Sequence, residues 1–171
     1  MSRMRWLARI AGALLFTAPS LLAQGRTPAF GCGAAVNRQF DFWVGDWSVT
    51  VGGQPAGTNL LTSEEDGCVV HEHWNGSRGG TGQSLNFYDT AIGKWHQLWV
   101  DNQGNYLHLI GAFADDRMLL EGTAPGPDGK GQQQRLTFFK NRDGSVRQLW
   151  ETSADEGRHW AVAFDGLYVR K

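Results

Sequence analysis

The sequence predicts an all-β protein whose antiparallel strands form a meander that closes into a roughly ten-stranded barrel, after a short N-terminal helix. Extended segments of about seven to twelve residues follow one another from residue 46 to residue 170. Glycine is abundant, at 23 residues, whereas proline is scarce, at 5. A sheet of that many strands tends to close, because closure removes its exposed edges.

Ten segments are predicted to be strands. They are residues 46–52, 57–65, 68–74, 82–89, 94–101, 105–113, 117–123, 134–140, 146–153 and 159–170. The turns between them contain pairs such as Asp66-Gly67 and Asp143-Gly144, which supply the positive φ that tight hairpins require. The only helical candidate is a segment of one or two turns within residues 34–43.

The N-terminus has the order of a secretory signal peptide. Three arginines precede an apolar run over residues 10–16, and the small residue Ala23 is suited to cleavage. The predicted domains are therefore a signal peptide at 1–23, an N-terminal segment at 24–39 and a β-barrel domain at 40–171. The apolar run is too short to span a bilayer as a helix, although an uncleaved anchor is an alternative. We expect a periplasmic or extracellular protein.

Cysteine content fits that location. Cys32 and Cys68 are the two cysteines of the chain. Outside the cytoplasm a disulfide between them is favoured over two separate thiols. Two cysteines so far apart do not by themselves indicate a zinc site.

Charge excludes two classes of partner. The formal net charge is −1, and it becomes −4 once the three arginines of residues 1–23 are removed. Such a chain has no basic surface for nucleic acid, nor for an anionic membrane. No membrane association beyond the signal peptide is expected.

A Glu or Gln two residues before a Trp occurs three times. The pairs are Glu72 and Trp74, Gln97 and Trp99, and Gln148 and Trp150. Residues i and i+2 of a strand lie on the same face, so each pair shares a face, and Trp95 and Asp101 share the face of Gln97. The third pair follows the second by 51 residues within a matching hairpin, which reflects either duplication or recurring geometry.

One face of these strands must line the barrel interior. The opposite face carries His71, His73, Arg147 and Glu151, which are costly to enclose without partners. Trp and Gln can instead line a partly wet cavity. We therefore predict an interior ligand pocket; its predicted residues are Glu72, Trp74, Trp95, Gln97, Trp99, Asp101, Gln148 and Trp150. The alternative is that these Trp side chains fill the core.

The segment before and within the first strand reads FDFWVGDWSVT, over residues 40–50. Its Gly45-Asp46-Trp47 resembles the G-x-W signature of lipocalins and the wider calycin group, in which the Trp closes one end of the barrel. There, a basic residue from a late strand often packs on the Trp. The resemblance implies Arg170 as the partner of Trp47, with Arg147 as the second candidate.

Further segments extend this resemblance across residues 40–170. With GCVVHEHW, SLNFYD, QLWVD, RQLWE and FDGLY, the chain is similar to the DUF1579-like family of secreted bacterial proteins, for which a lipocalin- or nitrobindin-like barrel is expected. Nitrobindin-type barrels bind haem through a histidine near the last strands. Neither His108 nor His159 lies in a recognisable copy of that motif, so no cofactor is predicted.

Two other motifs have a local interpretation. His71 and His73 have the spacing of two metal ligands on one strand face, but this pattern alone is weak and no metal site is predicted. SADEGRHW, residues 153–160, resembles the Asp-box, S-x-D-x-G-x-x-W, with His159 where Thr is usual. We interpret it as a structural hairpin turn in which Ser and Asp side chains cap backbone amides.

We interpret the protein as a secreted barrel that binds a small, partly apolar ligand, with no catalytic residue assigned. No G-x-S-x-G sequence marks a nucleophile. One alternative is a small hydrolase or isomerase that uses Glu72 or Asp101, because a carboxylate enclosed by Trp has a raised pKa. The other is a structural or interaction module with a filled core. The sequence does not indicate an oligomeric state.

Overall fold

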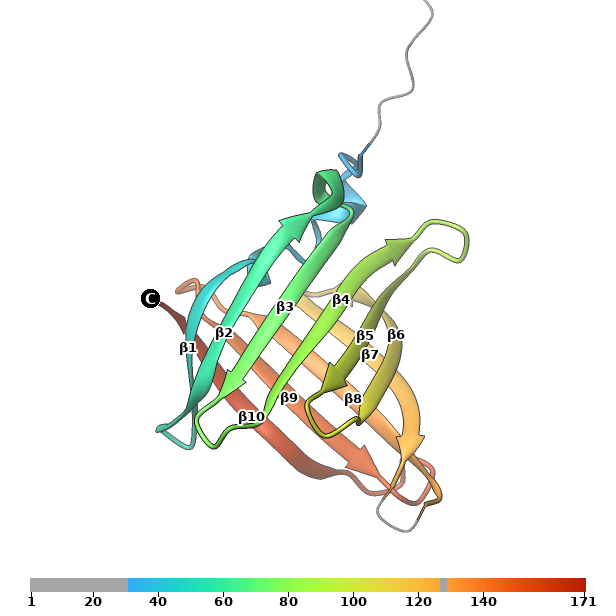
Figure 1. The fold of residues 1–171 in the computed structure, drawn as a ribbon. Helices are drawn as coiled ribbons and strands as arrows, with labels where there is room; N and C mark the ends of the chain where they lie inside the picture. Colours follow the sequence, from blue (N-terminus) through green and yellow to red (C-terminus); the bar gives the residue numbers. More distant parts are fainter. Residues whose placement is uncertain (1–30, 127–128) are drawn as a thin grey trace, which may run out of the picture.

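The computed structural model describes residues 31–126 and 129–171, and the predicted signal peptide at 1–23 lies outside them. Ten antiparallel strands form a closed barrel in sequence order, with β1 paired to both β2 and β10 (Figure 1). The strands are β1 (Gly45–Val51), β2 (Gln54–Glu64), β3 (Val69–Gly76), β4 (Thr81–Asp89), β5 (Lys94–Asp101), β6 (Tyr106–Ala114), β7 (Arg117–Pro125), β8 (Gly131–Lys140), β9 (Val146–Ser153) and β10 (Ala161–Arg170). The predicted fold class is confirmed.

Strand bounds agree with the sequence prediction to within three residues. One of the larger differences is at β2, which starts before Pro55 rather than after it. Gly52 and Gly53 have φ of 55° and 78°, so they form a two-residue turn between β1 and β2. Pro55 therefore sits beside the hairpin turn, opposite Thr50, and its missing N–H falls at the end of the ladder.

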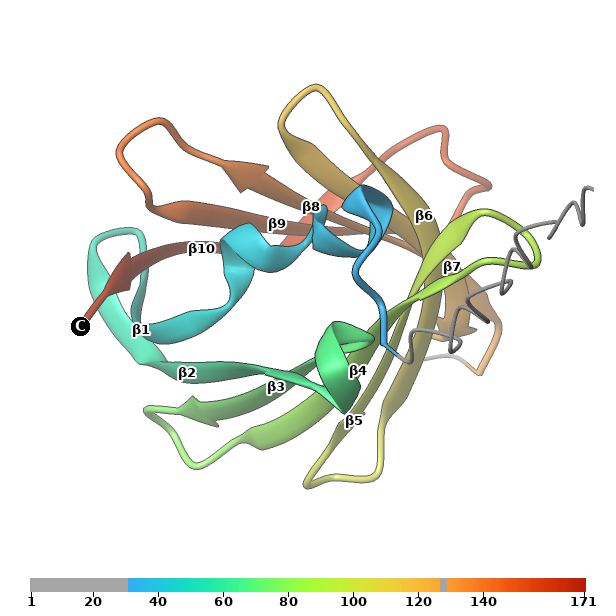
Figure 2. The same cartoon turned by 90° about the horizontal axis from the view of Figure 1, so that it is seen from above.

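The predicted N-terminal helix consists of two short 3-10 turns, η1 (Ala35–Arg38) and η2 (Asp41–Trp43). Figure 2 shows this segment lying over the opening at one end of the barrel. Phe40 and Trp43 are fully buried there, and the Phe40 ring lies 5.0 Å from Trp43 and 5.2 Å from Phe138, centroid to centroid. We refer to this end of the barrel, filled by these side chains, as the closed end.

A disulfide ties the segment before η1 to the barrel wall. Cys32 bonds to Cys68, which follows the 3-10 turn η3 (Glu65–Gly67) between β2 and β3. Arg38 donates a hydrogen bond to the carbonyl of Gly67, close to the disulfide. Closing a span of 36 residues stabilises the folded chain by about 4 kcal/mol in the chain-entropy account.

The G-x-W residues complete the closed end. Trp47 is fully buried and donates its indole N–H to the carbonyl of Trp43, at 2.9 Å. The Arg170 guanidinium carbon lies 4.3 Å from the Trp47 ring centroid, and Arg170 also donates to the carbonyl of Val44. Arg147, the second candidate, lies instead on the outer wall, where it pairs with Asp165 at 2.7 Å.

Candidate functional site

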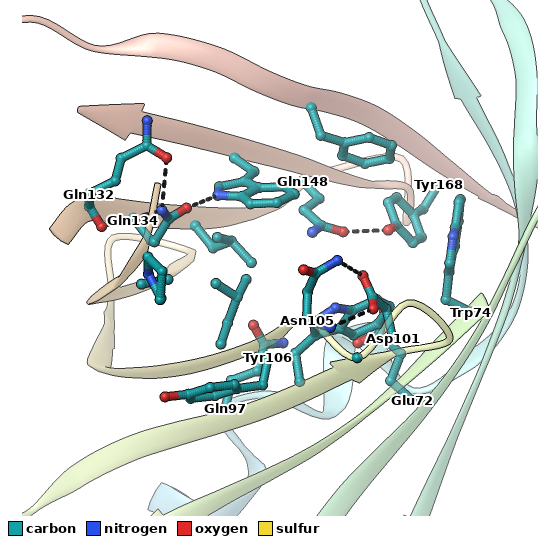
Figure 3. Close-up of a pocket in the computed structure, with 18 residues that line it drawn as sticks. Glu72, Trp74, Gln97, Asp101, Asn105, Tyr106, Gln132, Gln134, Gln148 and Tyr168 are labelled. Atoms are coloured by element: carbon teal, nitrogen blue, oxygen red, sulfur yellow. Dashed lines mark hydrogen bonds between the residues drawn. The ribbon is translucent and has the colours of Figure 1, made fainter. Parts of the chain in front are cut away.

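The Glu/Gln/Trp face points into the barrel, and at the end away from η2 it encloses a cavity of about 540 Å³ (Figure 3). The lining residues are Glu72, Trp74, Gln97, Trp99, Asp101, Gly104, Asn105, Tyr106, Leu107, Ala124, Pro125, Gln132, Gln134, Leu136, Gln148, Trp150, Phe164 and Tyr168. Strand register brings Glu72 and Trp99 to the same level of the barrel. Glu72 on β3 pairs with Ser84 on β4, and Ser84 pairs with Trp99 on β5. We refer to this half of the barrel as the open half.

Seven of the eight predicted pocket residues line this cavity, and Trp95 does not. Trp95 faces inward as predicted, but it is buried at the closed end, where its indole N–H donates to Gln39 Oε1 at 3.0 Å. Its ring also contacts Phe40, at 5.7 Å. Residues four apart on one strand are separated by about 13 Å along it, so Trp95 and Trp99 share a face and lie at different depths.

Several lining residues were missed by the sequence analysis. Gln132, Gln134 and Leu136 alternate along β8, and Phe164 and Tyr168 share a face of β10. The two-residue alternation that places residues of β3, β5 and β9 inside the barrel also places these residues on the inward face. Neither β8 nor β10 contains a Glu or Gln two residues before a Trp, so that motif does not mark them.

Trp74 and Trp99 lie against glycines of neighbouring strands, which keeps the cavity open. A Cβ at Gly82 would meet the Trp99 ring at 2.3 Å, and a Cβ at Gly57 would meet the Trp74 ring at 2.9 Å. Because no side chain stands beneath them, the two indoles lie close to the wall and do not fill the centre. The Trp face is therefore interior, as predicted, and in this half it does not form a filled core.

Glu72 forms the polar floor of the cavity. It is 4% exposed, Asn59 Nδ2 donates to its Oε1 at 2.7 Å, and Ser84 Oγ donates to its Oε2 at 2.6 Å. Burial raises the pKa of Glu72 to about 7, because the two hydrogen bonds only partly offset the loss of hydration. This carboxyl group therefore changes its charge near neutral pH.

The wall above Glu72 carries polar groups that pair with one another. The Tyr168 hydroxyl donates to Gln148 Oε1, and the Trp150 indole N–H donates to Gln134 Oε1 at 2.8 Å (Figure 3). Burial, followed by the negative charge of Glu72, raises the pKa of Tyr168 well above its ordinary value, so the phenol keeps its proton. These pairs hold the wall side chains in fixed orientations.

Asp101 lies at the mouth of the cavity and has a structural function. Its carboxylate accepts hydrogen bonds from the backbone N–H groups of Gln103 and Asn105, and from Asn105 Nδ2, each at 2.9 Å. These bonds, with the Asn105 side chain contributing most, lower the pKa of Asp101. Asp101 is thus an ionised carboxylate that holds the β5–β6 turn, which is unfavourable for a general base near neutral pH.

All five histidines are described, and none of them lines the cavity. His96 and His108 contact each other at 3.0 Å on the outer face of β5 and β6, and His159 lies in the turn between β9 and β10. Within residues 31–126 and 129–171, one group has the geometry of a metal site: Glu64, His71 and His73 on the outer wall. His71 Nδ1 already lies 3.2 Å from both Glu64 oxygens, so these two side chains are partners of each other.

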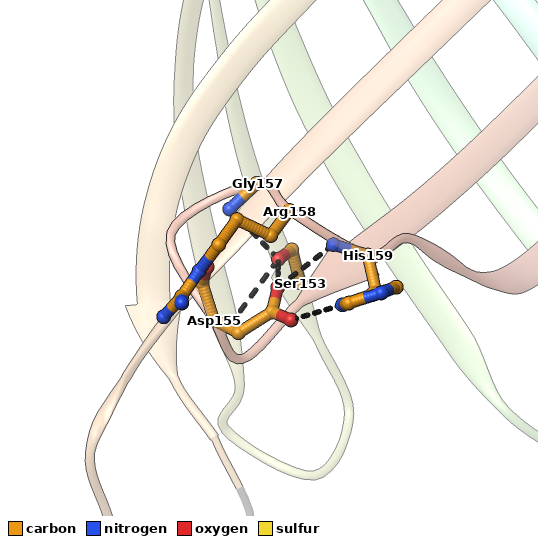
Figure 4. Close-up of polar contacts among 5 residues, drawn as sticks. All are labelled: Ser153, Asp155, Gly157, Arg158 and His159. Atoms are coloured by element: carbon orange, nitrogen blue, oxygen red, sulfur yellow. Dashed lines mark hydrogen bonds and ion pairs between the residues drawn. The ribbon is translucent and has the colours of Figure 1, made fainter.

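The Asp-box-like turn is built from side-chain caps, as expected (Figure 4). Ser153 Oγ accepts the N–H of Gly157 at 2.9 Å and donates to Asp155 Oδ1 at 2.8 Å. Asp155 in turn accepts the backbone N–H of His159 at 2.9 Å. The Arg135 guanidinium covers the Trp160 ring, 4.0 Å from its centroid. These contacts hold the β9–β10 hairpin and do not involve cavity-lining residues.

Comparison with known proteins gives no family for this chain: no protein-family model matches it, and no curated protein matches it either. No helix in the described part of the chain has the length and apolar character needed to cross a membrane.

Proposed function

We propose that this protein binds a small, partly apolar molecule in the open half of its barrel. The observation that carries this proposal is an interior cavity of about 540 Å³ with indole walls and a few oriented polar groups. Its volume falls within the range of roughly 300–1,000 Å³ that is typical of small-molecule sites. A closed barrel with buried aromatic residues at one end provides a rigid support for such a site.

The proposed location is the periplasm or the cell exterior. The Cys32–Cys68 disulfide is compatible with an oxidising compartment. The arrangement of charge, apolar run and small residue over residues 1–23 supports secretion. We also propose membership of the DUF1579-like group, on the motifs quoted above.

A matched pair of substitutions tests whether binding occurs in the cavity. Leu107→Trp places an indole inside the cavity, whereas Leu98→Trp places one on the outer face of the neighbouring strand, where Leu98 is exposed. Ligand-observed NMR against a library of small apolar compounds should find binders of the wild type and of Leu98→Trp. Those signals should be lost with Leu107→Trp; retention of the same binders would contradict the proposal.

A second candidate function is acid–base catalysis by Glu72, as in a small hydrolase or isomerase. It is favoured by one observation, the pKa of about 7 of a carboxyl group at the floor of a cavity. Mass spectrometry of each bound compound after incubation separates the two functions. A catalyst converts the compound, and Glu72→Gln abolishes conversion but keeps binding. A carrier returns the compound unchanged.

A further inference from the structure

The ionisable carboxyl groups that line the cavity are not balanced by basic residues. Two of its lining residues are carboxylic acids, Glu72 at the floor and Asp101 at the mouth. Among the described residues that line it, none is Lys, Arg or His. A cavity walled by low-dielectric aromatic groups strengthens the field of such charges. This field disfavours a carboxylate or phosphate ligand and favours a cation.

Several hydrogen-bond acceptors at the floor lack partners within the described part of the chain. Asn59 and Asn86 commit their amide nitrogens to Glu72 and to the carbonyl of Val70, which fixes the orientation of both amides. Their Oδ1 atoms, and Oε1 of the cavity-lining Gln97, are buried without a hydrogen-bond partner among the residues described. Each Glu72 oxygen accepts one bond and has room for another. Of the residues that carry these acceptors, Glu72 and Gln97 line the cavity, so this part of the floor suits a ligand group that donates hydrogen bonds.

Aromatic rings surround the same region. Trp74 and Phe164 meet edge to face at 6.1 Å, and Trp99 lies over Gly82 on the strand between β3 and β5. The Tyr168 ring is also part of the wall (Figure 3). Faces of indole and phenol rings attract cations, and the attraction grows when water is excluded.

From these three observations we propose that the ligand is a protonated primary or secondary amine with an apolar body. Its ammonium group donates hydrogen bonds to Glu72 and Gln97, and its apolar part lies between the indoles of Trp74, Trp99 and Trp150. This inference rests on the proposed function, because it specifies the ligand of the same cavity.

Binding of an ammonium ion requires an ionised Glu72, which makes affinity depend on pH. The groups around Glu72 are the neutral Asn59 and Ser84, the protonated Tyr168 across the cavity, and His71 on the outer face of the same strand. Asp101, at the mouth, is ionised throughout the neutral range. Since the pKa of Glu72 is about 7, the apparent affinity should be about tenfold lower at pH 6 than at pH 8.

Three probes with one carbon skeleton test the proposal: 3-phenylpropylamine, 3-phenylpropan-1-ol and 3-phenylpropionate, each titrated calorimetrically into the full-length protein. The amine remains protonated at both pH values, because aliphatic amines have a pKa near that of Lys. We expect it to bind at least about tenfold more tightly than the alcohol at pH 8, with no measurable binding of the carboxylate. At pH 6, buffers of different ionisation enthalpy should reveal nearly one proton released per amine bound.

Two variants localise the effect. Glu72→Gln should reduce amine affinity to that of the alcohol and leave the alcohol unchanged, which also shows that the cavity is intact. Glu64 is an exposed carboxylate on the neighbouring strand, β2. Glu64→Gln should therefore change neither the affinity for the amine nor the affinity for the alcohol. Equal binding of amine and alcohol by the wild type, or amine binding without proton release at pH 6, would overturn the amine proposal and keep the cavity as a binding site. If none of the three probes binds, the amine proposal fails, and the library screen with Leu107→Trp and Leu98→Trp decides whether the cavity is a binding site.

Discussion

The closed end and the open half of the barrel use the same kinds of side chain to opposite effect. Trp95 and Trp99 face inward from one strand, four residues apart, yet Trp95 is 2% exposed within a packed cluster whereas Trp99 borders a cavity. The difference comes from their neighbours. Trp95 meets Phe40 and Tyr88, which are large rings, whereas Trp99 lies across Gly82. An inward Trp therefore makes core or pocket according to the size of the residues opposite it.

The largest expected effect comes from a substitution that disrupts packing at the closed end. Trp43→Ala removes a fully buried indole that stacks on Phe40, so the free energy of unfolding should fall by about 3–5 kcal/mol. Trp99→Ala is the matched change in the open half and should cost clearly less, because that indole already borders empty space. Urea unfolding followed by circular dichroism measures both. Equal losses would show that the two halves do not differ as described.

Reduction of the disulfide loosens the same end by another route. Breaking Cys32–Cys68 should lower the free energy of unfolding by about 4 kcal/mol, because the unfolded chain regains the freedom of a 36-residue span. Thermal unfolding with and without a reductant measures the change, and a Cys32→Ser/Cys68→Ser variant should show no further response. Binding in the open half should persist at temperatures where the reduced protein is folded, since neither cysteine lines the cavity.

Sequence patterns were sufficient for the architecture. Alternation along each strand, with Gly-containing turns between, located all ten strands and the helical segment at residues 34–43. These signals are local, and antiparallel neighbours follow directly from short turns. Arg170 also followed from the sequence as the partner of Trp47, through the resemblance of the first strand to the G-x-W signature.

The sequence predicts which face of each strand lines the site, but not how far along the barrel each side chain lies. A two-residue period tells which side of a strand points inward, and it placed Glu72, Gln97 and Gln148 correctly inside. Depth along the barrel depends on where Phe40 and Trp43 insert, which is a contact between distant segments with no periodic signature. Trp95 was therefore assigned to the pocket although it belongs to the closed end. The floor made by Asn59 and Ser84 under Glu72 likewise depends on strand register.

After the disulfide, the next largest expected effect is a pH dependence of the free energy of unfolding. It distinguishes the two carboxyl groups of the open half, Glu72 and Asp101. In the unfolded chain Glu72 has a pKa of about 4.5, and in the folded chain about 7, so the folded state binds the extra proton between these values. Stability is therefore greater at pH 5 and declines as pH rises through 7, by roughly 2–3 kcal/mol. The Glu72→Gln variant should lack this decline in urea unfolding at pH 5 to 8.

Asp101→Asn is the control for that measurement. The pKa of Asp101 is lowered in the folded state, so its contribution changes only below the unfolded-state pKa, in the acid range. The decline between pH 5 and pH 8 should be the same in Asp101→Asn as in the wild type. A flat profile for the wild type would contradict the burial of an ionisable Glu72.

The smallest expected effect comes from substituting Gly82, the glycine that lets Trp99 line a cavity and not a packed core. Gly82→Ala places a Cβ 2.3 Å from the Trp99 ring and 2.9 Å from the carbonyl of Val100, so the indole must move toward the cavity centre. We expect a loss of about 1–2 kcal/mol in urea unfolding and weaker binding of any cavity ligand. Gly80→Ala is the control, because a Cβ there meets nothing within 4 Å, and its effect should stay within about 1 kcal/mol. If Gly82→Ala instead left both stability and binding unchanged, Trp99 would not be held against the wall by the absence of a side chain, and the contrast with Trp95 would need another cause.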